Sequence, residues 1–184
     1  NTLATDVIIP YGVTSIKDYA FNTCENLTNI VIPDSATSIG ESAFEECINL
    51  KSVTIGNSVT NIGYSAFYSC EKLTGVTIGN SVESIGESAF EDCKKLIEVK
   101  NLSSTLTIET SSEDNGYVGY YAKRIYTEGN SYLSAENDYI IYDDGTDIIL
   151  VDYTGTEADL TLPEGITKIN DYAFNDYKSL TSVT

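Results

Sequence analysis

Residues 53–75 read VTIGNSVTNIGYSAFYSCEKLTG, and nearly the same string stands directly before and directly after them. The copies recur every 23 residues. Repetition at such a period is typical of a solenoid, in which each coil buries its apolar face against the next coil. The repeat therefore predicts an elongated stack of coils rather than a round core.

Each copy carries the same apolar columns. A strand-like Leu-x-x-Val-x-Ile is followed by a second apolar pair, then by Ala-Phe, and three residues later by cysteine. The unit returns near the C-terminus with Leu160, Ile169 and Phe174, so five coils are visible. One phenylalanine comes from each coil, and we expect these rings to form a single internal stack with coils about 4.8 Å apart. They are Phe21, Phe44, Phe67, Phe90 and Phe174.

The local structure of a coil follows from its residue types. Thr, Val and Ile favour an extended strand. Pro10, Pro33 and Pro163 end the strand in the column where other coils have Gly56 and Gly79. Because proline fixes φ at about −65°, we expect a negative φ at these glycines too. The Ser-Ala-Phe-x-x-Cys segment predicts a short helix or a single turn on the opposite side.

An interruption separates the first four repeats from the last. Within it, residues 105–109 alternate like a strand, and Val118, Tyr121, Ala122 and Ile125 have the spacing of an amphipathic helix. Two apolar runs, 139–142 and 148–153, flank an Asp-Asp-Gly-Thr turn and predict a β-hairpin.

These segments give a domain organisation with three parts. Residues 1–101 are expected to form repeats 1–4. Residues 102–157 form an insert of strand, helix and β-hairpin that continues the solenoid. Residues 158–184 form a further repeat, which we expect to be truncated at its C-terminal end.

Charge and composition exclude several classes of function. The chain has 28 acidic and 10 basic residues among 184, a formal charge of −18. Nucleic acids and anionic membranes select for Lys and Arg, so neither is an expected partner. No apolar run is long enough to span a membrane, which predicts no membrane insertion. Strong mutual repulsion favours a monomer.

The multi-position pattern Leu-x-x-Val-x-Ile-Pro/Gly-x-x-Val-x-x-Ile-Gly-x-x-Ala-Phe-x-x-Cys resembles the BspA-like subclass of bacterial leucine-rich repeats, which also have a 23-residue period. The resemblance covers about residues 4–101 and 158–184, with Tyr177 standing in the cysteine column. It implies a leucine-rich-repeat solenoid, a β-rich α/β right-handed superhelix. It also implies a secreted or cell-surface protein that acts in adhesion or protein binding, with a host extracellular-matrix or plasma protein as partner.

The four cysteines allow two interpretations. In an extracellular protein they could form two disulfides. They occupy one column, however, which favours a buried ladder of free thiols because an unpaired cysteine behaves as a small hydrophobic residue. A zinc site is not expected, because thiolates spread along a line cannot surround one tetrahedral ion. They are Cys24, Cys47, Cys70 and Cys93.

Little in the sequence points to catalysis or to a cofactor. There is no histidine, the usual base for a Ser or Cys nucleophile. Adjacent acids such as Glu45 and Glu46 have the character of solvated turn residues. We predict no catalytic residues, no cofactor and no metal site. Calcium is a minor hypothesis. Its candidate ligands are Asp143, Asp144, Asp147 and Asp152.

The remaining candidate is a ligand-contact surface on the sheet face and the Tyr-rich insert. The outward positions of the strands bear small polar groups, which suits a broad contact with a protein or glycan. Eight tyrosines in the insert could add contact area or simply pack the interrupted solenoid. The residues we expect at this surface are Lys51, Thr54, Thr77, Lys100, Tyr121 and Arg124. The alternatives are a structural spacer that projects other domains from the cell surface and, less favoured, an enzyme that uses paired carboxylates.

Overall fold

A computed structural model describes residues 6–136, 138–175 and 177–184. The chain divides into two compact units, residues 1–129 and 130–184. The described residues contain strands and turns but no helix, and hence none long and apolar enough to cross a membrane.

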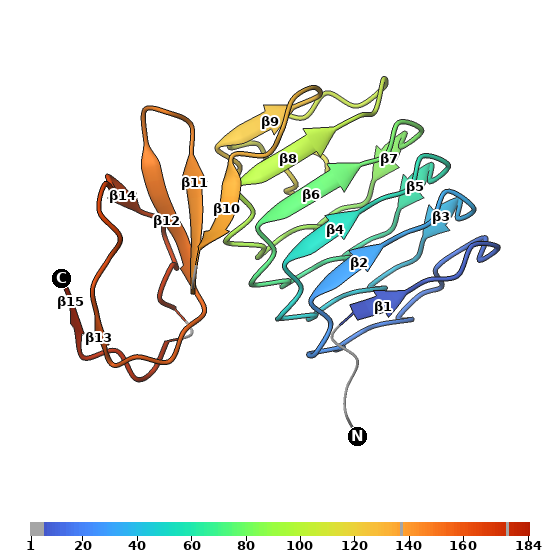
Figure 1. The fold of residues 1–184 in the computed structure, drawn as a ribbon. Helices are drawn as coiled ribbons and strands as arrows, with labels where there is room; N and C mark the ends of the chain where they lie inside the picture. The colour runs from blue at the N-terminus through green and yellow to red at the C-terminus, as the bar shows by residue number, and fades with distance from the viewer. Residues whose placement is uncertain (1–5, 137, 176) are drawn as a thin grey trace. The chain divides into compact units, whose positions relative to one another are not determined.

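The first unit is built on a parallel sheet of six strands in the order β1-β2-β4-β6-β8-β9. Its strands are β1 (Asp6–Ile8), β2 (Asn29–Val31), β4 (Ser52–Thr54), β6 (Gly75–Ile78), β8 (Glu98–Asn101) and β9 (Arg124–Tyr126). Val53 pairs with Ile30 on one side and with Val76 on the other, so the pairing advances by one repeat from strand to strand. Figure 1 shows these strands as successive rungs, each contributed by one coil.

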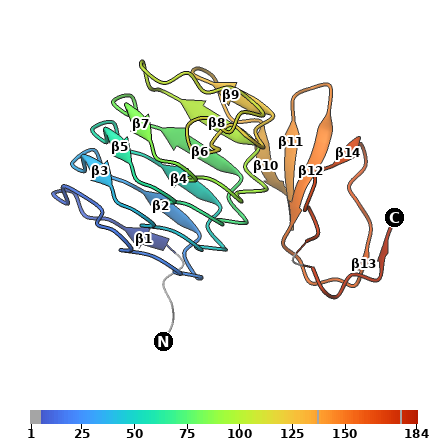
Figure 2. The ribbon, with the colours of Figure 1, turned by 180° about the vertical axis from the view of Figure 1, so that it is seen from behind.

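A second, shorter parallel sheet runs along the same coils. It consists of β3 (Ser38–Ile39), β5 (Asn61–Ile62) and β7 (Ser84–Ile85), and Ile16 forms an isolated bridge to Ile39. Figure 2 shows these strands in a row beside the larger sheet. The hydrophobic core fills the interior of the coils, where the leucine, isoleucine and phenylalanine columns are almost fully buried.

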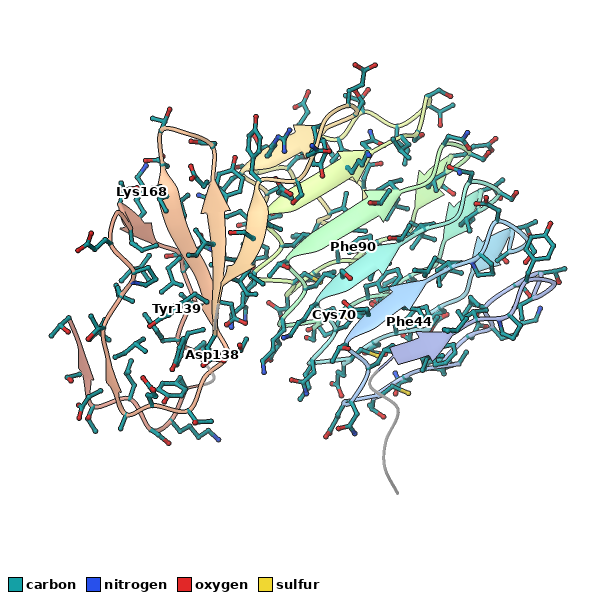
Figure 3. All side chains as sticks on the ribbon, viewed as in Figure 1. Phe44, Cys70, Phe90, Asp138, Tyr139 and Lys168 are labelled. Atoms are coloured by element: carbon teal, nitrogen blue, oxygen red, sulfur yellow. The ribbon has the colours of Figure 1, made fainter. Side chains whose placement is uncertain are left out.

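The phenylalanine stack is confirmed for four of its five members. Phe21, Phe44, Phe67 and Phe90 stack with ring centroids 5.0 Å apart. Two of them, Phe44 and Phe90, are labelled in Figure 3. Phe174 belongs to the second unit, where its ring lies 6.3 Å from that of Tyr153 at an angle of 53°. The expectation of one continuous stack was wrong because residues 102–157 do not supply a phenylalanine for each intervening coil.

The Ser-Ala-Phe-x-x-Cys segment forms consecutive turns, which confirms the turn alternative and excludes the short helix. Two columns of these turns have a left-handed backbone. One contains Ser42 at φ 50° and Ser65 at φ 49°, and the other contains Glu46 at φ 55° and Ser69 at φ 54°. A helix requires negative φ at every residue, so left-handed residues four positions apart exclude it.

Ser69 provides a direct test of this backbone conformation. Its N–H donates a hydrogen bond to the carbonyl oxygen of Glu91 in the next coil at 2.9 Å. Ser69→Pro removes the donor and imposes negative φ, so we expect the free energy of unfolding to fall by about 3 kcal/mol or more. Ser69→Gly accepts positive φ and should stay within about 1 kcal/mol of the parent. Denaturant titration measures both, and equal stability of the two variants would contradict the left-handed turn.

The helix expected around residues 118–125 is absent. Val118 and Ala122 are buried as their spacing predicted, but residues 118–120 form turns rather than a helix. The chain then enters β9, which pairs with β8. The periodicity was misread because consecutive turns of a solenoid also bury residues three and four positions apart.

The strand expected at residues 105–109 is also absent. Leu106 and Ile108 pack on the core, but the nearby backbone groups bond to side chains rather than to a neighbouring strand. The N–H of Leu106 donates to Ser103 Oγ at 3.1 Å, and Asn115 Nδ2 donates to the carbonyl oxygen of Thr107 at 3.0 Å. These residues belong to an additional coil of the first unit, between β8 and β9.

The second unit contains the predicted β-hairpin. Strands β11 (Tyr139–Asp143) and β12 (Ile148–Tyr153) are antiparallel, with β10 (Leu133–Glu136) antiparallel to β11 and β14 (Lys168–Ile169) parallel to β12. Strands β13 (Asp159–Leu160) and β15 (Ser182–Val183) form a parallel pair.

The structure is thus a β-solenoid of strands and turns and not the expected α/β superhelix. The expected number of five coils was too low, because the first unit alone contributes six parallel strands to one sheet.

Candidate functional site: the sheet face of the first unit

The register of the large sheet aligns its inward and its outward side chains into separate rows. Val7, Ile30, Val53, Val76, Val99 and Ile125 form the inward row. The next position along each strand faces outward, and we call this set the outer row. It consists of Ile8, Val31, Thr54, Thr77, Lys100 and Tyr126.

The polar members of the outer row differ from most polar side chains of the coils. Elsewhere such side chains bond from coil to coil: Thr60 Oγ1 donates to the Thr37 carbonyl oxygen at 3.2 Å, and Lys72 Nζ donates to Asn49 Oδ1 at 2.9 Å. Within the described part of the chain, the side chains of Thr54, Thr77 and Lys100 form no hydrogen bond or ion pair. Their polar groups are therefore not used to hold the coils together.

The structure brings together only some of the six residues expected at the ligand-contact surface. Thr54, Thr77 and Lys100 lie side by side on β4, β6 and β8. Lys51 directly precedes β4, and its N–H donates to the carbonyl oxygen of Thr28 at 2.7 Å. Tyr121 lies outside the strands, in the turn before β9, with its ring 4.8 Å from that of Tyr120.

Arg124 lies on β9, opposite Glu98 on β8. Its Nη1 atom donates to Glu98 Oε1 at 3.1 Å, and its guanidinium lies 4.0 Å from the centre of the Tyr126 ring. The Glu98 side chain is only 3 % exposed. A buried carboxylate and an aromatic ring therefore fix the orientation of the guanidinium.

Glu98 and Tyr126 were missed by sequence reasoning. The segment that contains β9 does not follow the repeat, so its alignment with β8 could not be read from a 23-residue spacing. The signal that could have found them is the Lys-Arg-Ile-Tyr string of residues 123–126, in which Ile125 continues the inward valine row.

The other end of the outer row is apolar. Ile8 is 88 % exposed and Val31 is 60 % exposed. Both border a cavity of about 270 Å³, and two further cavities of about 410 and 320 Å³ adjoin the same first coil. Their linings are mainly apolar and contain no cluster of carboxylates.

Several tyrosines of the predicted insert pack inside the second unit. Tyr142 and Tyr153 are buried in the second unit. Tyr153 lies at the centre of a group of rings, 5.1 Å from Tyr139 and 5.2 Å from Tyr177. Tyr139 also donates a hydrogen bond from its hydroxyl to the Thr161 carbonyl oxygen at 2.8 Å. These contacts favour packing of the second unit as the role of the buried rings.

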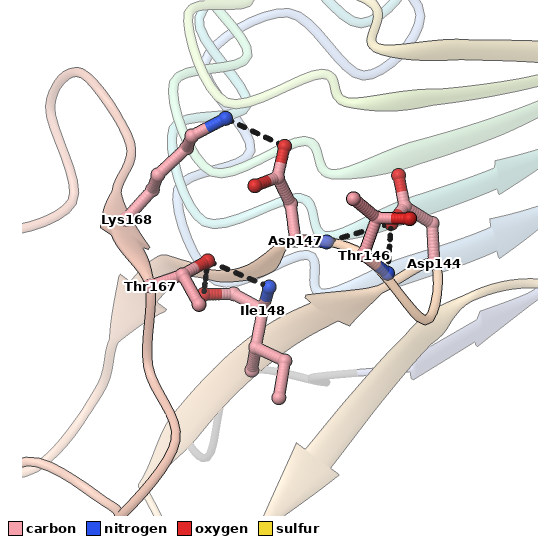
Figure 4. A network of polar contacts seen from close by, with 6 residues as sticks. All are labelled: Asp144, Thr146, Asp147, Ile148, Thr167 and Lys168. Carbon is pink, nitrogen blue, oxygen red and sulfur yellow. Dashed lines mark hydrogen bonds and ion pairs between the residues drawn. The ribbon is translucent and has the colours of Figure 1, made fainter.

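Two of the four aspartates considered for calcium, Asp144 and Asp147, make polar contacts at and beside the hairpin turn (Figure 4). Asp144 Oδ1 accepts hydrogen bonds from the N–H groups of Thr146 and Asp147. These bonds hold the pKa of the Asp144 carboxyl below its ordinary value. Asp147 forms an ion pair with Lys168 at 2.6 Å. Among the described residues, no group of three or more acidic, Cys or His side chains could hold a metal ion.

The cysteine column is a ladder of free thiols. Cys47, Cys70 and Cys93 are buried, and each Sγ donates to a phenylalanine carbonyl oxygen of the preceding coil at 3.1, 3.3 and 3.2 Å. Cys24 is half-buried. Burial raises the pKa of the Cys47 thiol to about 12 and that of Cys70 well above its ordinary value.

We expect graded thiol reactivity. At pH 8 a thiol reagent should modify Cys24 in the folded protein, whereas all four cysteines should react in denaturant. The unfolded chain ionises Cys47 near pH 9, but the folded chain keeps it protonated to about pH 12. The stabilisation from this thiol is therefore complete below about pH 9 and is lost as the pH rises toward 12. Fewer than four reactive thiols in denaturant without reductant would indicate a disulfide.

The comparisons with known proteins agree with this geometry. The model of the BspA type leucine rich repeat region matches six copies of its repeat, over residues 1–115 and 153–184. This chain belongs to the BspA-type leucine-rich repeat family. No protein of curated function matches it.

Solved structures of other leucine-rich repeat proteins are similar to this BspA-type chain. One from Bacteroides ovatus is 25 % identical with a TM-score of 0.50, and the match covers 97 % of this chain and 45 % of the other. One from Bacteroides capillosus is 27 % identical with a TM-score of 0.47, covering 68 % and 78 %. A leucine rich cell surface protein from Faecalibacterium prausnitzii is 22 % identical with a TM-score of 0.38, covering 96 % and 68 %.

Proposed function

We propose that this chain is a non-enzymatic binding or adhesion module, secreted or displayed at the cell surface, that recognises a protein or glycan through the sheet face of its first unit. The observation that carries the proposal is the outer row. Thr54, Thr77 and Lys100 present polar groups on adjacent strands that form no hydrogen bonds within the described chain. Repeat proteins use such extended surfaces for binding.

The absence of histidine from the sequence supports a non-enzymatic role, since the usual general base is missing. The paired acids have contacts that suit turns: Glu45 accepts a hydrogen bond from Asn22 at 3.1 Å, and Asp92 lies 3.4 Å from Lys94. The module acts as a monomer in this proposal, and its partner is an extracellular-matrix protein, a plasma protein or a glycan.

A structural spacer is the second candidate. The hydrogen-bonded ladder that runs from coil to coil favours it, because continuous pairing makes a rigid element. A spacer would need no ligand, and its function would not depend on the identity of outward side chains.

A binding screen against extracellular-matrix proteins, plasma proteins and glycans tests the proposal. We expect at least one ligand whose affinity falls by about tenfold or more in a variant with Thr54→Ala, Thr77→Ala and Lys100→Ala together. The matched control carries Thr110→Ala, Thr156→Ala and Lys17→Ala, all exposed positions outside the outer row. A ligand that binds both variants as well as the parent would exclude this face, and a screen without any ligand would favour the spacer.

A further inference from the structure

The sheet face of the first unit has a charge opposite to that of the whole protein. Its six strands, each with the residue before it, carry four basic residues and two acidic residues, Asp6 and Glu98. The turn segments 34–49, 57–72 and 80–95 of the same coils carry nine acidic and three basic residues. In a chain of formal charge −18, the sheet face is therefore a local cationic surface.

The solvent-facing part of this surface is more cationic than the residue count indicates. Of the two acids, Asp6 belongs to the edge strand β1, at the opposite edge from β9, and Glu98 is buried and bonded to Arg124. Lys123 is exposed, Lys51 and Lys100 are half-buried, and none of the three forms an ion pair with any residue that the structure describes. Lys51 and Lys123 occupy equivalent backbone positions of different coils. N–H to carbonyl hydrogen bonds connect these positions from coil to coil, in the order Lys51, Thr74, Ile97 and Lys123.

Hydroxyl groups and an aromatic ring accompany the positive charge. The outer row places Thr54 and Thr77 beside Lys100, and Lys100 beside Tyr126. Hydroxyl groups exchange hydrogen bonds with sugar hydroxyls, an aromatic face packs against the C–H face of a sugar ring, and cations bind carboxylate or sulfate. Because neighbouring strands each contribute one residue to the outer row, these side chains follow one another at regular intervals perpendicular to the strands.

From this combination we propose that the sheet face of the first unit binds an acidic polysaccharide. The glycan lies across the strands, and its carboxylate or sulfate groups contact Lys51, Lys100 and Lys123. This inference rests on the proposed function and assigns its ligand class. The protein as a whole repels a polyanion, but salt screens its distant acidic residues more strongly than it screens lysines in direct contact with the glycan. The local attraction therefore exceeds the overall repulsion.

An acidic protein fits this surface less well. Protein interfaces depend on large apolar or aromatic anchors near their centre. The middle of the outer row offers only Thr54, Thr77 and Lys100. Its aromatic ring, Tyr126, lies at one end, and its large exposed apolar side chains, Ile8 and Val31, lie at the other.

The test measures binding of the full chain to immobilised heparin, with neutral dextran as a reference. We expect binding to heparin and none to dextran. The face variant carries Lys51→Gln, Lys100→Gln and Lys123→Gln, and its affinity for heparin should fall by about tenfold or more. The control carries Lys17→Gln, Lys94→Gln and Lys178→Gln, which changes net charge equally, and its affinity should change less than about threefold.

Each other outcome overturns the inference in a distinguishable way. Equal losses in the two variants would show that only net charge matters. Poly-glutamate that binds as tightly as heparin, with the same loss in the face variant, would identify an acidic peptide as the ligand class. If the parent does not bind heparin but binds another ligand that is sensitive to Thr54 and Thr77, the ligand class is wrong while the proposed function stands.

Discussion

Replacing Phe67 with alanine is expected to lower the free energy of unfolding by about 3–5 kcal/mol. Phe67 is fully buried, and its ring stacks between those of Phe44 and Phe90 at 5.0 Å on each side. The substitution removes both ring contacts and leaves a cavity inside the coil. Because each coil of a solenoid is stabilised by its neighbours, the loss weakens the interfaces on both sides. Denaturant titration followed by circular dichroism measures it.

Phe21→Ala is the matched control. Phe21 is half-buried and stacks on one side only, against Phe44, so its replacement should cost roughly half as much. Exposed Tyr64 gives a second control, since Tyr64→Ala should change stability by less than about 0.5 kcal/mol. If Phe67→Ala unfolded at the same denaturant concentration as the parent, the phenylalanine column could not be the centre of the core.

Gly63→Ala is expected to cost about 3 kcal/mol, at or above the usual range for overpacking. A Cβ atom at this position would lie 2.6 Å from the carbonyl carbon of Gly40 and 2.7 Å from the backbone nitrogen of Glu41. Both atoms belong to the backbone of the preceding coil, which cannot move without disturbing the ladder. The substitution should lower the melting temperature by several degrees, as measured by thermal unfolding.

Gly12→Ala separates steric conflict from backbone strain. Gly12 has φ of +105° but no atom within 4 Å of an added Cβ, so we expect a loss of only about 1–2 kcal/mol from strain. Gly63 has no positive φ, and its loss must come from the close approach of the coils. A smaller effect at Gly63 than at Gly12 would mean that the coils can separate without cost.

The repeat and its core could be predicted from the sequence because the residues that make packing contacts recur every 23 positions. The strand columns, the buried thiols and the phenylalanine stack of the first unit all follow from this period. Glycines 56 and 79 avoid positive φ, as their alternation with proline predicted. The hairpin was also predictable, because Asp-Asp-Gly marks a tight turn by local chemistry alone.

The errors arose where several structures share one pattern. Val118 and Ala122 have a spacing that serves a helix and a pair of solenoid turns equally well. What decides between them is the chain's entry into β9 at Arg124, only two residues after Ala122, and that depends on pairing with β8.

The candidate site was predictable only in part. Thr54, Thr77 and Lys100 share a repeat column, so their row could be read directly. Arg124 could be named but not paired, because its contact with Glu98 depends on a coil that departs from the repeat.

The central claim is that the sheet face of the first unit binds an acidic polysaccharide. Nuclear magnetic resonance of the protein with ¹³C-dimethylated lysines tests it most directly, because methylation keeps the charge and gives a signal for each lysine. On titration with heparin, we predict that the signals of Lys51, Lys100 and Lys123 shift, whereas those of exposed Lys17 and Lys178 do not. Shifts confined to Lys17 and Lys178, or no shift at any lysine, would contradict the claim.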